Sequence, residues 1–175
     1  MLTRMLMAGV VGSVLVAAGP LTAAAQDKVS PADFLIKEGK RLRDAKELTA
    51  ALEYFEAAAK VDPKSANALV QAAWAANETG DFAKGSQLAT AATKLEPNNS
   101  DAWTELGYAQ MKQKQYIRAV RSLQAAIEKD EKNWSAYDYL ADAYRAGGDE
   151  DEAKAVEEQK KKKMDTSKEK PKGKG

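Results

Sequence analysis

The chain has 175 residues, a net charge of +1, and neither cysteine nor histidine. Without these two residue types, a disulfide framework, Ser-His-Asp and Cys-His catalytic arrangements, and the usual zinc ligand sets are excluded. The glycine-rich patterns that bind phosphate, G-x-x-x-x-G-K-[ST] and G-x-G-x-x-G, are also absent, so we predict a non-catalytic protein with no cofactor and no metal site.

The N-terminal residues have the pattern of a signal peptide. One positive charge, Arg4, precedes an apolar run of 14 residues, 5–18, which fits a signal core and is too short to span a bilayer. A helix-breaking Gly-Pro pair follows, and the Ala-x-Ala sequence at 23–25 is a pattern that signal peptidase accepts. We therefore predict a signal peptide at 1–25, cleaved after Ala25, and export to the periplasm or out of the cell. An uncleaved membrane anchor is the alternative, and residues 26–30 are a short segment before the first helix.

A period of 34 residues runs through the rest of the chain. Pro63 and Pro97 lie 34 residues apart, and small and bulky side chains fall into columns at the same spacing. One column of small residues contains Ala51, Gly85, Ala119 and Ala153, and one column of large residues contains Leu35, Leu69, Trp103 and Tyr137. Four columns of small residues at a single period are hard to obtain by chance, so we predict a repeat protein.

The repeating unit resembles the tetratricopeptide repeat, which reads W-x2-L-G-x2-Y, then A-x3-F, then P. Trp103, Leu106 and Gly107 match the first part of this pattern, and Ala119 and Leu123 follow at the expected distances. The departures are Gln110 in place of tyrosine, Gly85 in place of alanine and Glu131 in place of proline.

The resemblance implies an all-α fold, a right-handed α-solenoid of about four helix-turn-helix repeats within residues 31–163. The repeats are expected at residues 32–65, 66–99, 100–133 and 134–163. In the third unit, mostly apolar residues recur at about i, i+3, i+4 and i+7 in both helices, at 103–110 and 116–126, and each helical pair is expected to bury only part of its apolar face. The neighbouring pairs must cover the rest, and a single repeat should not fold alone.

Several helix ends can be predicted from caps and breakers. The sequence Ser-Pro-Ala-Asp at 30–33 favours a helix start, because it offers a capping hydroxyl, a proline in the first turn and an acid. Gly80 and the Gly147-Gly148 pair suit the left-handed residue that ends a helix. The acids at 149–152 lack the glycine and the ligand spacing of a calcium loop, so we interpret them as favourable charges at the start of the last helix.

The C-terminal end is strongly basic. Residues 159–175 hold eight lysines and two acids, for a net charge of +6, whereas residues 26–158 have a net charge of −6. Because it has almost no apolar side chains, we predict that the segment 164–175 is a disordered Lys-rich tail, apart from a few residues that continue the last helix. Two roles are open for this tail: weak contact with an anionic surface, or solvation of the last helix. Nucleic acid is not an expected partner of an exported protein.

In tetratricopeptide repeat proteins the first helix of each pair lines a concave groove, and the resemblance implies which residues face it here. The candidate partner-binding residues form two columns: Lys40, Trp74, Tyr108 and Asp142, and Arg43, Asn77, Met111 and Arg145. Trp74, Tyr108 and Met111 are the expected anchors, since aromatic side chains contribute much of the energy of an interface. Chaperone-binding members of the family use a clamp rich in lysine and asparagine in this groove. Asp101 and Glu105 stand where that clamp would have basic residues, which argues against a chaperone C-terminus as the partner.

Two classes of function follow from these patterns. The first is an exported adaptor that binds a peptide or protein partner, of unknown identity, in the concave groove. The second is a structural module of the cell envelope that self-associates and is tethered to a membrane or cell-wall polymer by its lysines. Self-association predicts a mass that grows with concentration, whereas the adaptor is expected to stay monomeric without its partner.

Overall fold

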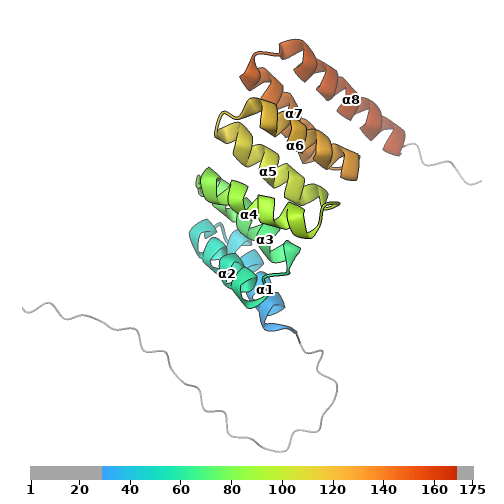
Figure 1. Cartoon of the computed structure of the whole chain (residues 1–175). Coiled ribbons are helices and arrows are strands. Elements are labelled where there is room, and N and C mark those ends of the chain that lie inside the picture. Colours follow the sequence, from blue (N-terminus) through green and yellow to red (C-terminus); the bar gives the residue numbers. More distant parts are fainter. Residues whose placement is uncertain (1–28, 169–175) are drawn as a thin grey trace, which may run out of the picture.

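The structure, a computed structural model, describes residues 29–168; the predicted signal peptide and residues 169–175 lie outside this range. The described part is all-helical and contains no strand, which confirms the predicted fold class. Its helices form four pairs stacked one on the next, the first to the fourth repeat (Figure 1). They are α1 (Pro31–Asp44), α2 (Leu48–Val61), α3 (Ala66–Glu78), α4 (Phe82–Leu95), α5 (Ser100–Lys112), α6 (Tyr116–Lys129), α7 (Trp134–Gly147) and α8 (Glu150–Lys168).

The last helix is the longest. α8 runs to Lys168, so residues 164–168, at the start of the predicted tail, belong to it. Glu, Lys, Gln and Met are good helix formers, and the acids in its first turn face the positive end of the helix dipole. No helix in the described range is both long and apolar enough to cross a bilayer.

The turn inside each pair contains one residue in the left-handed region. These residues are Lys46, Gly80, Lys114 and Gly148, with φ of 63°, 85°, 61° and 96°. They follow the 34-residue period, and the glycine ends predicted at Gly80 and Gly148 are confirmed. Gly147 is instead the last residue of α7. A lysine in this region is strained relative to glycine, because its Cβ approaches the backbone.

The first helix of every pair has a side-chain cap. Ser30, Ser65, Asn99 and Asn133 each accept a hydrogen bond from the backbone N–H three residues further on, over 3.0 to 3.2 Å. Such a cap satisfies one of the free N–H groups of the first turn and contributes about 1 kcal/mol. These caps fix where each repeat begins.

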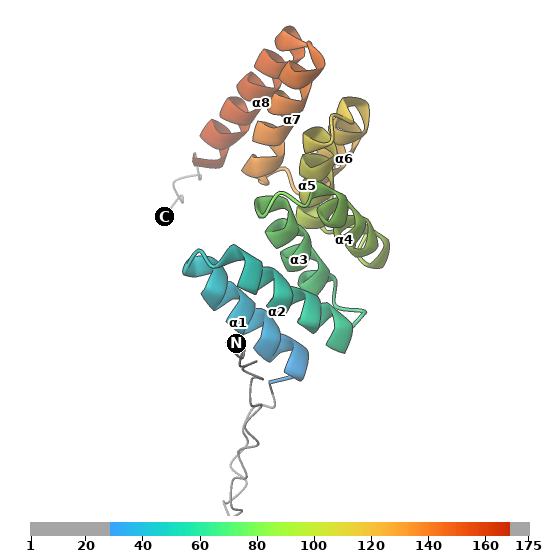
Figure 2. The same ribbon diagram turned by 90° about the vertical axis from the view of Figure 1, so that its left-hand side faces the viewer.

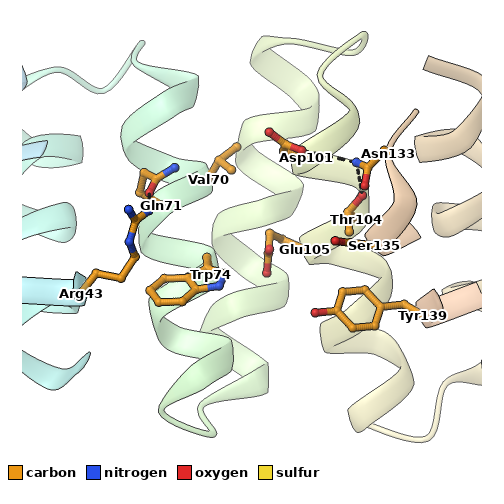
Figure 3. A pocket seen from close by; sticks show the side chains of 10 residues that line it. All are labelled: Arg43, Val70, Gln71, Trp74, Asp101, Thr104, Glu105, Asn133, Ser135 and Tyr139. Carbon is orange, nitrogen blue, oxygen red and sulfur yellow. Dashed lines mark hydrogen bonds between the residues drawn. The ribbon is translucent and has the colours of Figure 1, made fainter. Parts of the chain in front are cut away.

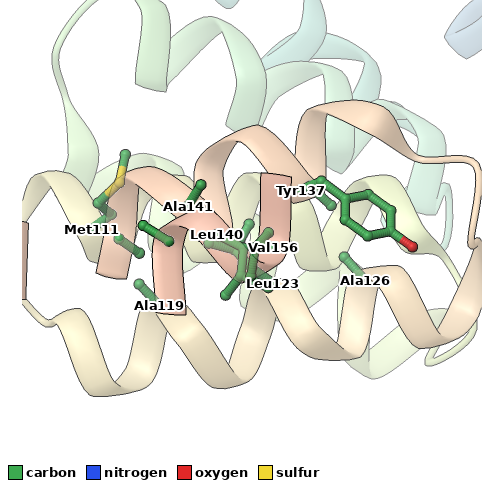
Figure 4. Packing of buried hydrophobic residues seen from close by; sticks show 11 residues of the cluster. Met111, Ala119, Leu123, Ala126, Tyr137, Leu140, Ala141 and Val156 are labelled. Atoms are coloured by element: carbon green, nitrogen blue, oxygen red, sulfur yellow. The ribbon is translucent and has the colours of Figure 1, made fainter. Parts of the chain in front are cut away.

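The core is shared between neighbouring pairs. Figure 4 shows buried side chains from α6, α7 and α8 gathered together with one from α5. The cluster includes Met111, Ala119, Leu123, Ala126, Tyr137, Leu140, Ala141 and Val156. Because no pair supplies this cluster alone, each repeat depends on its neighbour for burial of its apolar face.

Small residues allow the two helices of a pair to approach closely. A Cβ on Gly39 would lie 2.5 Å from the Phe55 ring, and a Cβ on Gly107 would lie 2.5 Å from Leu123 Cγ. Both bulky side chains are fully buried. The stack as a whole curves: in Figure 2 the first and last pairs both lie to the left of the middle pairs. The curvature leaves α1, α3, α5 and α7 around one side of the molecule.

Candidate functional site

The concave side of the stack holds a pocket of about 430 Å³. The first helix of each repeat, together with the residue that caps α7, provides its lining (Figure 3). The lining residues are Arg43, Val70, Gln71, Trp74, Asp101, Thr104, Glu105, Asn133, Ser135 and Tyr139. A pocket built from all four repeats requires them to be stacked, so the site is a property of the solenoid and not of one repeat.

Glu105 lies at the centre of this pocket, between Trp74 and Tyr139 (Figure 3). Its Oε2 accepts a hydrogen bond of 2.8 Å from Asn77 Nδ2, and the same nitrogen donates to the Glu105 backbone oxygen over 3.1 Å. The amide of Asn77 therefore holds both the backbone and the side chain of Glu105.

The environment of Glu105 disfavours its charged form. Burial raises the pKa of its carboxyl to about 7, and the hydrogen bond from Asn77 opposes this shift. The neighbouring carboxylates of Glu78 and Asp101 raise the pKa further. The central acid of the pocket therefore titrates near neutral pH.

Gly85 makes room for Asn77. The Asn77 side chain is only 2% exposed, and a Cβ on Gly85 would lie 2.0 Å from its Oδ1. Alanine, the residue that the repeat pattern has at this place, would therefore collide with the amide. The departure at Gly85 is explained by a polar side chain that reaches from α3 across to α5.

Asn133 ties α7 to α5 at one edge of the pocket. Besides capping α7, it donates from Nδ2 to Ser100 Oγ at 2.8 Å and to Thr104 Oγ1 at 2.9 Å. A longer contact of 3.3 Å reaches Asp101 Oδ1. One amide thus sets the position of the fourth repeat against the third.

Aromatic rings form the walls of the groove, and two of them already hold cations of the chain. The Arg43 guanidinium lies 5.8 Å from the centre of the Trp74 ring, and Lys112 Nζ lies 5.2 Å from that of Tyr108. The Tyr108 and Tyr139 rings are 4.6 Å apart. Burial raises the pKa of Tyr139 to about 12, helped by the Glu105 carboxyl, so its hydroxyl stays protonated.

Two family models of the tetratricopeptide repeat match the chain, one over residues 42–107 and the other over residues 104–159. Together with the helical pairs and their 34-residue period, these matches decide the family. The chain belongs to the tetratricopeptide repeat family. No curated protein matches it.

Solved structures with the same fold include two tetratricopeptide repeat domains and MamA. The Sgt2 domain from Aspergillus fumigatus is 26% identical, with a TM-score of 0.63 over 66% of this chain and 79% of that one. MamA from Desulfovibrio magneticus RS-1 is 16% identical, with a TM-score of 0.69 over 79% of this chain and 78% of that one. The first tetratricopeptide repeat domain of Spaghetti (RPAP3), solved bound to the HSP90 peptide SRMEEVD, is 18% identical, with a TM-score of 0.63, over 67% and 93% of the two chains.

Two of the eight predicted groove residues of this tetratricopeptide repeat protein line the pocket, namely Arg43 and Trp74. Tyr108 is half-buried in the aromatic group beside the pocket, and Lys40 is half-buried without lining it. Asp142 and Arg145 form an ion pair of 3.2 Å at the last repeat, away from the pocket.

The other two predicted residues are buried. Asn77 lies beneath the groove surface, where it acts through Glu105, and Met111 is 8% exposed in the core cluster. The prediction of Met111 as a groove anchor is therefore wrong in its placement: the following repeat covers this side chain. A partner-binding role for the remaining residues stays a prediction.

The predicted partner-binding residues left out the column at the centre of the pocket, although the family resemblance had already placed Glu105 of this column in the groove. Gln71, Glu105 and Tyr139 follow the 34-residue period, directly after the column of Val70 and Thr104. The period itself was the signal that could have found them. Residues 29–168 bring no three metal-ligating acids together, and the site offers aromatic rings, amides and carboxyls.

Proposed function

We propose that this chain is an exported, non-catalytic scaffold that binds a segment of a protein or peptide partner in its concave pocket. The observation that carries the proposal is the pocket itself, because four repeats direct side chains into one cavity with aromatic walls. A concave site with aromatic residues and a few polar groups at its centre is typical of binding sites. Export rests on the signal-peptide pattern of residues 1–25.

Peptide binding by a protein of similar fold supports this proposal. The Spaghetti domain was solved with the peptide SRMEEVD, which has three acidic side chains. The pocket of this chain contains Asp101 and Glu105. We therefore propose a partner whose charge differs from that of the HSP90 peptide.

The test is affinity capture from an envelope extract with the full chain as bait. Trp74→Ala removes an aromatic wall of the pocket and is expected to reduce capture of the specific partner at least about tenfold. Tyr54→Ala is the matched control, since Tyr54 is 38% exposed on α2 and does not line the pocket. Capture that survives Trp74→Ala unchanged would place the binding surface elsewhere and refute the proposal.

A further inference from the structure

The central carboxyl of the pocket has no cationic partner. Glu105 forms no ion pair with any residue in the described range, although nine such pairs occur there. Its single side-chain hydrogen bond comes from the neutral amide of Asn77. Glu105 is half-buried, and a carboxylate withdrawn from water normally has a charged partner, because burial without one is costly.

The side chains around Glu105 are suited to a positive charge. Trp74 and Tyr139 lie on either side of it (Figure 3), and the faces of aromatic rings attract cations. The chain itself shows this preference nearby, where Arg43 stacks on Trp74 and Lys112 on Tyr108. Asp101 adds a second carboxylate to the same pocket.

Arg43 is the only cation that lines the pocket, and its guanidinium interacts with groups other than Glu105. Its guanidinium pairs with Asp44 over 3.0 Å and donates to Gln71 over 3.4 Å. It therefore does not neutralise Glu105, whose pKa responds to the neighbouring carboxylates of Glu78 and Asp101 and to no cation.

We propose that the pocket takes the arginine or lysine side chain of a partner protein, with the cation on Glu105 and Asp101 and between Trp74 and Tyr139. This inference rests on the proposed function and specifies the chemistry of the partner segment. Arginine fits best, because its planar guanidinium can stack on a ring and donate two hydrogen bonds to a carboxylate at once. The protonated hydroxyl of Tyr139 is available to donate to a backbone carbonyl of the same segment.

The basic end of the chain itself is the less suitable source of this cation. Lys160 pairs with Asp138 of α7 over 2.6 Å, and Lys163 pairs with Glu131 in the turn before α7, so two lysines of the run already contact acids of their own chain. The segment that contains them is helical up to Lys168. A separate protein is therefore the occupant that we propose.

The test uses synthetic peptides of nine residues with varied flanking sequences and the full chain. Each peptide is made with arginine, citrulline or glutamate at its centre, and fluorescence anisotropy gives the dissociation constants. Citrulline has nearly the shape of arginine without its charge, so the arginine-to-citrulline ratio isolates the cation. We expect arginine peptides to bind at least about tenfold tighter than their citrulline versions.

Glu105→Gln should reduce this ratio to roughly one to three, because it removes the charge and keeps the shape. Glu53→Gln is the matched control: it makes the same charge change on the exposed side of α2, and the ratio should be unchanged. Circular dichroism and urea unfolding establish that both variants are folded.

Three outcomes overturn the inference: no binding of any arginine peptide, equal binding of citrulline or glutamate versions, or an unchanged ratio in Glu105→Gln. In each case the proposed function is judged separately by the Trp74→Ala capture experiment. Light scattering tests the source of the cation. Growth of mass with concentration that disappears when residues 169–175 are removed would make a second copy the occupant and overturn the choice of a separate partner.

Discussion

The second and third repeats have the same helical plan but fill the space between their helices differently. In the third repeat, Gly107 leaves room for Leu123, which is fully buried. In the second repeat, Gly85 leaves room for the amide of Asn77, which holds the Glu105 carboxyl. One glycine therefore serves apolar packing, and the other serves the positioning of a polar group in the pocket.

This difference shows how a repeat protein can separate stability from function. The period requires a small residue where two helices approach closely, and it does not determine which side chain uses the space. When an amide fills this space, the repeat buries less apolar surface, and the neighbouring repeats must provide the missing apolar burial. The following changes test this division of roles.

The largest effect is expected from Leu123→Ala in the third repeat. Removal of a fully buried leucine should lower the free energy of unfolding by about 3 kcal/mol. Urea denaturation of the full chain, followed by circular dichroism, measures the loss. Leu95→Ala is the control, because Leu95 is 42% exposed and should cost less than about 1 kcal/mol. A loss as small as that of the control would show that the third repeat is not held by this contact.

Gly85→Ala should have the next largest effect. The added Cβ, 2.0 Å from Asn77 Oδ1, forces the amide away from Glu105 and should cost about 1 to 3 kcal/mol. The double variant Asn77→Ala with Gly85→Ala tests this cause, because the alanine at 85 should cost much less once the amide is absent. Equal costs in the two backgrounds would mean that the glycine serves something other than Asn77.

The pH dependence of stability should reveal the raised pKa of Glu105 in the folded state. A carboxyl whose pKa rises on folding, here to about 7, holds more protons in the folded than in the unfolded state. The contribution of Glu105 to the free energy of unfolding is fully present below the unfolded pKa of about 4.3 and is lost as the pH rises to about 7. The variant Glu105→Gln lacks this loss, so it should be more stable than the wild type at pH 8 by about 1 to 3 kcal/mol.

The measurement is the difference between the two unfolding free energies at a series of pH values from 4 to 8. Carboxylates in ion pairs elsewhere contribute equally to both proteins and cancel in the difference. A difference that does not change with pH would show that Glu105 has an ordinary pKa.

The smallest effect concerns the turns, where the second repeat has Gly80 and the third has Lys114. Lys114→Gly relieves a left-handed lysine and should stabilise the chain by about 0.5 to 1 kcal/mol, whereas Gly80→Ala should destabilise it by a similar amount. Thermal unfolding of both variants checks the opposite signs. The same sign for both would mean that the turn conformation does not control these positions.

The sequence predicted the framework of the fold well because the framework is periodic. Small residues and turn residues recur every 34 positions, as do the caps Ser65, Asn99 and Asn133, and each has a local physical reason. The centre of the pocket was harder, because Glu105 is held by an amide on α3 that depends on a glycine on α4. Three residues from three helices have no common signal in one sequence.

One predicted column shows why a period does not determine exposure. Arg43, Asn77, Met111 and Arg145 occupy equivalent places in the four repeats. Asn77 and Met111 are buried, whereas the side chains of Arg43 and Arg145 are 34% and 37% exposed. Burial at equivalent places therefore differs with the side chain: the two long charged arginines reach solvent, whereas the shorter Asn77 and Met111 pack inside.

The amide of Asn133 has a consequence for the size of ligand that the molecule accepts. Its hydrogen bonds fix the fourth repeat against α5, and the fourth repeat carries Tyr139, the far wall of the pocket. Asn133, a single side chain at the start of α7, therefore helps to set the distance between the Trp74 and Tyr139 walls of the pocket. Exchanging Asn133 would therefore be expected to change the width of the pocket, and it would also alter the pocket lining, since Asn133 lines the site and contacts Asp101.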